Sequence, residues 1–197
     1  MIAILLNDAS FEQDIRELLM AFYPGETFTH KEEEAGEAEL IVRGVRDGNS
    51  FSLDVTPVKK EVVHFALIYP DFSNRFETKN EIKRTLYRLL SAQTGRELPW
   101  GTLTGIRPTK IALTKLYDGW TDEQIETYMR ETYFTSKEKI DLSIDVAERE
   151  RRLLSTIDYE NGYSLYVGIP FCPTTCLYCS FTSFPIVKWE KRMDLYK

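Results

Sequence analysis

The sequence is poor in the residues that build disulfide frameworks and zinc sites. Its 197 residues include two histidines and three cysteines, and Cys172, Cys176 and Cys179 all lie within one eight-residue window. A disulfide would leave one thiol over, unlike the paired frameworks of small secreted domains. A structural zinc ion takes four ligands, and His30 and His64 lie more than a hundred residues upstream. A redox-active pair at the last two cysteines would leave the first unexplained.

The chain also lacks an apolar leader and an excess of basic charge. Met1–Leu6 is apolar but has no basic lead-in and stops at Asn7, too short for a signal peptide or a membrane span. The net charge is −6, and a run of glutamates occupies Lys31–Glu39. Because nucleic acids attract clustered cations, we predict no nucleic-acid partner. A solvated face is the simplest interpretation of the basic positions on one predicted helix, which are Lys79, Lys83, Arg84 and Arg88.

Residues 1–98 have the pattern of a small α/β domain. An apolar strand over Ile2–Leu6 precedes a helix, and a hairpin is predicted from 37–45 and 50–58 around Asp47-Gly48-Asn49. A further strand is expected over 62–69. A second helix ends at Gly95. The sequence places capping boxes at the starts of the two helices, Ser10 with Gln13 and Thr78 with Glu81.

Residues 99–158 are predicted to form a helical connector. Two further capping boxes, Thr121 with Gln124 and Thr135 with Glu138, each precede a run with helical apolar spacing. The connector leads into the third part, residues 159–197, which carries the cysteines.

The cysteine loop is expected to follow a short buried strand. Residues Ser164–Ile169 are mostly apolar, and Pro170 closes the run because proline cannot extend a strand ladder. Parallel sheets usually place their chemistry at the carboxyl ends of the strands. Three thiolates on one tight loop can each ligate one iron of a four-iron four-sulfur cluster and leave the fourth iron open.

The residues around the cysteines resemble a known superfamily. The string Tyr-x-x-Ile-Pro-Phe-Cys-x-x-x-Cys-x-Tyr-Cys-x-Phe spans Tyr166–Phe181. It resembles the radical S-adenosylmethionine superfamily, and within it the coproporphyrinogen-dehydrogenase branch, which includes haem-chaperone relatives. The string Leu-Pro-Trp-Gly-Thr-Leu-Thr-Gly-Ile-Arg-Pro-Thr-Lys over Leu98–Lys110 resembles the HemZ-type members of that branch.

The resemblance implies both cofactors and a reaction. Cys172, Cys176 and Cys179 would ligate a 4Fe–4S cluster, and S-adenosyl-L-methionine would bind the fourth iron and be cleaved to a 5′-deoxyadenosyl radical. In the coproporphyrinogen enzymes this radical starts the oxidative decarboxylation of coproporphyrinogen III propionates to vinyl groups in haem biosynthesis. Tyr178 matches a position near the adenine or the cluster, or else packs within the loop. Tyr166 matches a tyrosine near the cluster, or else points into the barrel.

Two positions depart from the branch pattern and leave an alternative function open. Gly168 stands where the branch often has histidine, and Phe181 stands where the best-known coproporphyrinogen enzymes carry a further cysteine. The haem-chaperone relatives also have an aromatic residue there, so a haem-binding or haem-delivery protein is the alternative. The enzyme would act on a porphyrinogen substrate in the cytoplasm, with a cytosolic electron donor such as flavodoxin or ferredoxin.

The length of the third part indicates an incomplete barrel. A (β/α) barrel of this type typically takes ~250 residues, whereas 159–197 can hold only the first strand, loop and start of a helix. We therefore expect an N-terminal fragment of a longer enzyme, inactive by itself. In the glycine-rich stretch Gly101–Lys110, Arg107 and Lys110 could contact a substrate carboxylate, or pair with local acids.

Overall fold

The computed structural model describes residues 1–58, 63–158, 161–174, 176–181 and 183–195. The chain divides into two compact units, residues 1–156 and 157–197. The first contains both the predicted α/β domain and the predicted helical connector. The second contains the cysteines.

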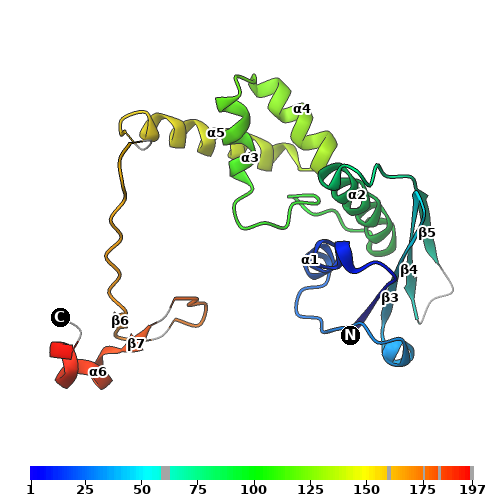
Figure 1. The fold of residues 1–197 in the computed structure, drawn as a ribbon, viewed down its shortest axis with the longest axis horizontal. Helices are drawn as coiled ribbons and strands as arrows, with labels where there is room; N and C mark the ends of the chain where they lie inside the picture. The colour runs from blue at the N-terminus through cyan, green and yellow to red at the C-terminus, as the bar shows by residue number, and fades with distance from the viewer. Residues whose placement is uncertain (59–62, 159–160, 175, 182, 196–197) are drawn as a thin grey trace. The chain divides into compact units, whose positions relative to one another are not determined.

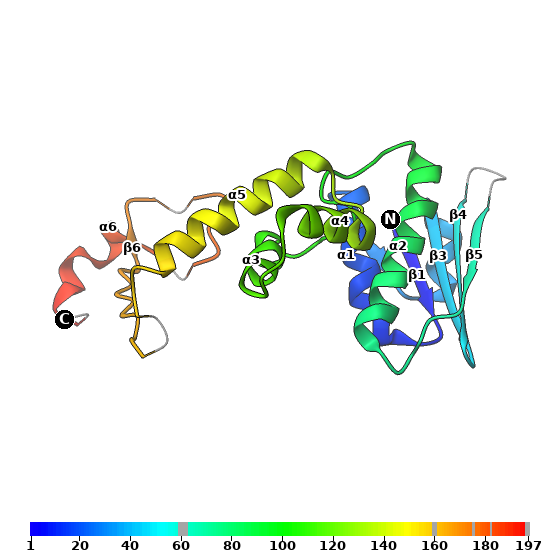
Figure 2. The ribbon, with the colours of Figure 1, turned by 90° about the horizontal axis from the view of Figure 1, so that it is seen from above.

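A five-stranded mixed sheet organises the first half of the first unit (Figures 1 and 2). The order is β2-β1-β3-β4-β5, with β1 parallel to both its neighbours and the β3–β4–β5 pairs antiparallel. The strands are β1 (Ile2–Leu6), β2 (Phe28–Thr29), β3 (Leu40–Asp47), β4 (Ser50–Pro57) and β5 (His64–Ile68). The predicted α/β class and the hairpin are confirmed, and Gly48 (φ 55°) occupies the turn. Residue 62, where the last strand was expected to begin, lies outside the described residues.

Two helices, α1 (Glu12–Phe22) and α2 (Arg75–Thr94), cover one face of this sheet (Figures 1 and 2). Alternate side chains of the strands point toward the helices, and the apolar stripes of both helices meet them. The resulting core contains Ile2, Ile4, Phe11, Ile15, Leu18, Leu19, Phe22, Leu40, Val42, Phe51, Leu53, Val55, Ile82, Leu86, Tyr87 and Leu90. A smaller cluster joins β1 to the 3-10 helix Glu32–Glu37 through Ala3, Leu5, Ala35 and Ala38.

The basic positions of α2 do not all lie on the solvated face that the sequence predicted. Lys83 is only 7% exposed, and its Nζ donates a hydrogen bond to Thr104 Oγ1 at 2.9 Å. Arg84 donates to the Thr132 carbonyl, and Arg88 lies over the Phe134 ring. The prediction was wrong for Lys83 and Arg84 because the chain after α2 folds back over this side of the helix, whereas Arg88 is exposed as predicted.

Three helices form the second half of the first unit, as predicted: α3 (Thr109–Tyr117), α4 (Asp122–Tyr133) and α5 (Lys137–Leu154). They enclose their own apolar cluster of Ala112, Leu113, Leu116, Ile125, Met129, Ile140 and Ala147.

The predicted capping box of α4 is confirmed, whereas the other three are wrong in detail. Both hydrogen bonds between Thr121 and Gln124 are present at the start of α4. At α2 and α5 a neighbouring short polar residue is the cap, whereas α1 follows directly on the 3-10 helix Ala9–Phe11 and has no side-chain cap of its own. Asp8 accepts from the Ser10 amide ahead of α1, and the N-caps of α2 and α5 are Asn74 and Ser136.

The second unit has little regular structure. It contains β6 (Phe171–Cys172) paired in parallel with β7 (Phe184–Pro185), then α6 (Ile186–Trp189) and a 3-10 helix over Glu190–Leu195. The strand predicted over 164–169 is not formed, and these residues are exposed. No other strand among the described residues pairs with them, and a strand without ladder hydrogen bonds and a covering layer is not stable. None of the helices in the described part of the chain has the length and apolar composition that a bilayer crossing requires.

Candidate functional site

The three cysteines are free thiols on one exposed loop. Cys176 is exposed, and Cys172 and Cys179 are half-buried. The Cys179 amide donates to the Cys176 carbonyl at 3.0 Å, a turn that brings these two residues close along the chain. The Cys179 Sγ lies 3.8 Å from Ser183 Oγ. Among the residues that the structure describes, no three histidine, cysteine or acidic side chains gather closely enough to hold a metal ion.

An aromatic cluster holds both ends of this loop. The Trp189 ring lies 5.8 Å from that of Phe171 and 5.5 Å from that of Phe184, measured between ring centroids. Phe171 immediately precedes the first cysteine, and the Phe184 amide donates to the Pro170 carbonyl at 2.7 Å. Trp189 therefore fixes the base of the cysteine loop. The role of Trp189 was not predicted from the sequence, although two aromatic residues flanking the cysteines and a third shortly after them give a usable signal.

Neither candidate tyrosine is packed against the cysteines. Tyr166 and Tyr178 are both largely exposed. The Tyr166 ring lies beside Gly168, where an added Cβ would come within 3.0 Å of it. A histidine at position 168 would therefore need the Tyr166 ring to move.

The glycine-rich stretch Gly101–Lys110 is packed within the first unit. Gly101 has φ 58°, and a Cβ there would lie 1.9 Å from the Tyr133 carbonyl oxygen, so only glycine fits. The next amide, of Thr102, donates to that carbonyl at 2.7 Å. Arg107 forms an ion pair with Glu150 on α5, so its observed partner is a local acid.

Thr104 links the two helices that cover the sheet. Its hydroxyl accepts from Lys83 Nζ on α2 and lies 2.8 Å from Glu17 Oε2 on α1, to which it donates. Burial lowers the pKa of Lys83, and the nearby carboxylates of Asp14 and Glu17 oppose that shift. Burial alone would raise the pKa of Glu17. Hydrogen bonds from Gln13 and Thr104, with the charge of Lys83, outweigh it and hold that pKa below its usual value.

An open cleft of about 610 Å³ lies beside this link. Its lining is mostly apolar and comes from α1 and the glycine-rich stretch: Glu17, Met20, Ala21, Trp100, Leu103, Thr104, Gly105, Ile106 and Pro108. The neighbouring cations Lys83 and Arg107 already have partners. The cleft therefore offers apolar contact rather than an anion site.

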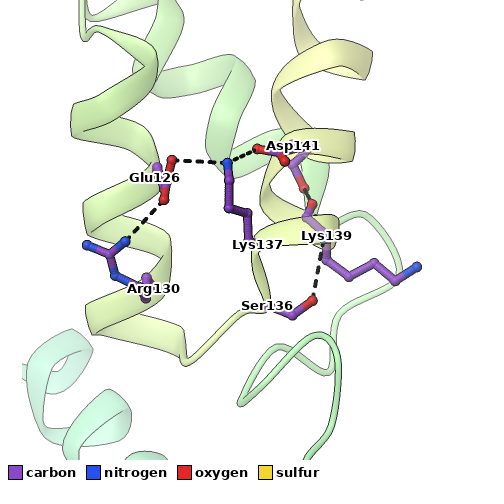
Figure 3. Close-up of polar contacts among 7 residues, drawn as sticks. Glu126, Arg130, Ser136, Lys137, Lys139 and Asp141 are labelled. Atoms are coloured by element: carbon purple, nitrogen blue, oxygen red, sulfur yellow. Dashed lines mark hydrogen bonds and ion pairs between the residues drawn. The ribbon is translucent and has the colours of Figure 1, made fainter.

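A groove between α4 and α5 is lined mainly by carboxylates. Figure 3 shows Lys137 between Glu126 of α4 and Asp141 of α5. Lys137 lies between its walls, with Nζ 2.9 Å from Asp141 and 3.4 Å from Glu126, and Arg130 also pairs with Glu126. The hydrogen bond to Asp141 is the main cause of the raised pKa of Lys137. Of these contacts, the ion pair between Lys137 and Glu126 joins the two helices.

The sequence is similar to a bacterial protein named for its likeness to a coproporphyrinogen oxidase. Over 135 residues, or 66% of this chain, it is 36% identical to the oxygen-independent coproporphyrinogen-III oxidase-like protein HemZ of Bacillus subtilis (strain 168). The chain spans about a quarter of that relative, 26% of its length. No family model matches the sequence. No solved structure matches it either.

Proposed function

Since the chain is HemZ-like over two thirds of its length, we propose that it carries the cluster-binding part of a radical S-adenosylmethionine oxidoreductase of haem biosynthesis. The observation that supports this most directly is the set of three free thiols on one exposed loop. The name of the relative supports a coproporphyrinogen as the substrate class. The proposed reaction of the complete enzyme is the oxidative decarboxylation of coproporphyrinogen III propionates to vinyl groups.

The thiols fit the proposed 4Fe–4S cluster in number and chemistry. Thiolates are the usual protein ligands of such clusters, and three of them leave one iron open for S-adenosylmethionine. When bound, the cluster would supply the electron that cleaves this cosubstrate. In the described part of the chain the three thiols do not gather into a preformed metal site. Because metal binding often orders the loop that carries its ligands, this arrangement is compatible with the proposal.

The remaining residues of the second unit would position and shield the loop. Phe171, Phe184 and Trp189 would hold its ends, and Tyr178 and Tyr166 would limit solvent around the sulfurs once the loop closes. Thiolate ligands need a reducing compartment, which supports a cytoplasmic location and an electron donor of the flavodoxin or ferredoxin type. The described part of the second unit supplies two short strands, β6 and β7, so we expect no turnover of coproporphyrinogen by this chain alone.

Anaerobic reconstitution of the chain with iron and sulfide tests the proposal. We expect about four iron and four sulfide atoms per chain, and an electron paramagnetic resonance signal of the reduced protein that changes on adding S-adenosylmethionine. Alanine substitution of Cys172, Cys176 or Cys179 should abolish cluster retention, whereas Ser180→Ala on the same loop should not. Unchanged iron content in the cysteine variants would refute the ligand assignment.

The same preparation distinguishes the alternative of a haem-delivery protein. Stoichiometric haem binding that survives the loss of the cluster, with no response to S-adenosylmethionine, would favour that alternative. The residues that support the haem-delivery alternative are Phe181 and Gly168, which depart from the pattern of the coproporphyrinogen enzymes.

A further inference from the structure

The free edge of the sheet is unusually well suited to pairing with another strand. β5 is the last strand in the order β2-β1-β3-β4-β5, and the opposite edge strand, β2, has only two residues. Natural edge strands are commonly protected by lysine, proline, bulges or inward charges. Between Val63 and Tyr69 the sequence is Val-His-Phe-Ala-Leu-Ile-Tyr, without a lysine, a carboxylate or a proline.

Four large apolar side chains stand exposed along this edge, on one face. Val63, Phe65, Leu67 and Tyr69 are 55%, 61%, 48% and 72% exposed. Their spacing of two residues puts them on the outer face, opposite the helices. The inner positions of β5 face the core side, where Ile68 packs against the main apolar cluster.

These exposed residues are arranged symmetrically about Ala66. In an antiparallel pair of two such strands with Ala66 opposite Ala66, Phe65 lies opposite Leu67 of the second copy, and Val63 lies opposite its Tyr69. A two-fold interface requires this self-complementarity, in which residue i meets j and j meets i. No like charges face each other in this register, and every exposed apolar side chain meets another.

We propose that two copies of this chain associate through antiparallel pairing of β5 with β5, which joins their sheets into one ten-stranded sheet centred on Ala66. Edge-to-edge pairing buries the flanks of the four apolar side chains and the strand edge of each copy, while the outer face of the joined sheet stays open to solvent. The buried area is therefore below the roughly 1,200 Å² at the lower end of specific interfaces. The dimer is therefore weak, with a dissociation constant of about 1–100 µM.

Sedimentation of the chain over a range of concentrations, in reductant so that the cysteines cannot crosslink, tests the dimer. Leu67→Lys and Phe65→Glu should each weaken it about tenfold or more, because each substitution disrupts two cross-strand pairs. Val45→Lys is the matched control. Val45 is 45% exposed on the outer face but lies on β3, away from the edge.

Mixing the two variants tests the register. In a mixed dimer Lys at position 67 meets Glu at position 65, and the unchanged Phe65 meets the unchanged Leu67, so the mixture should recover the dimer that each variant loses. Amide protection should rise with protein concentration across His64–Ile68 and not elsewhere in the sheet. A monomer at 100 µM or more, equal weakening by Val45→Lys, or no recovery in the mixture would overturn the proposal.

Discussion

At the scale of single residues, Lys83 is the least expected feature of the first unit. It lies in the core-facing part of α2, yet its amine has a hydroxyl partner and carboxylates nearby. Burial of a cation is costly unless it is paired, and here Thr104 and Glu17 provide the compensation. The lysine therefore specifies how the glycine-rich stretch sits against both helices.

The lowered pKa of Lys83 predicts an alkaline dependence of stability. The folded-state pKa lies below the ordinary value of 10.5, so the unfolded chain binds more protons between the two pKa values. The free energy of unfolding should consequently rise with pH in that window. Lys83→Met keeps the apolar stem and should remove this rise, which denaturant titrations at several pH values would measure.

Lys79→Met, one turn earlier on α2, is the control and should retain the alkaline rise. A wild-type profile that is flat, or one that Lys83→Met leaves unchanged, would contradict the assignment.

At the scale of elements, the second unit depends on one short strand pair and one tryptophan. We predict that Trp189→Ala lowers iron retention by the reconstituted chain several-fold, because the ends of the cysteine loop lose their common contact. Trp189→Phe keeps an aromatic ring between Phe171 and Phe184 and should retain most of the iron. Iron and sulfide analysis after gel filtration measures both.

If both variants kept wild-type iron content, the cluster itself would be sufficient to order the loop, and the proposed role of Trp189 would be wrong.

Helices, turns and caps were predictable where adjacent residues determine them. They were unpredictable where their structure depends on residues distant in the sequence. The hairpin at Gly48 and the capping box at Thr121 follow from a few adjacent residues, and both are present. The cap of α2 was misplaced because Asn74 and Thr78 both suit the role, and a tertiary contact decides: the Thr78 hydroxyl donates to the Asp71 carbonyl. The burial of Lys83 depends on Thr104, 21 residues later.

The candidate site shows the same division. The sequence shows the spacing of the cysteines and predicts that they share one loop. The structure places them on one loop as free thiols. The strand expected over 164–169 could not be judged locally, because a parallel strand is stabilised by neighbours that a single segment does not contain.

At the scale of the whole molecule, the division into two units predicts independent stability. Chymotrypsin should cut first after Tyr163 or Tyr166, which are 91% and 84% exposed near the start of the second unit. The released first unit should unfold within about 2 °C of the intact chain, because its two described apolar clusters consist of its own residues. Differential scanning fluorimetry before and after digestion measures this, and a larger loss would show that the second unit stabilises the first.

All three cysteines lie within eight residues of the second unit, and this affects how oxidation damages the protein in a cell. The first 156 residues contain no thiol, so exposure to air or peroxide has no cysteine to attack there. A molecule whose thiols have been oxidised would keep a folded first unit, whether or not proteases cut the exposed second unit. Damaged copies would then persist beside intact ones, and protein abundance would overstate the amount of working protein.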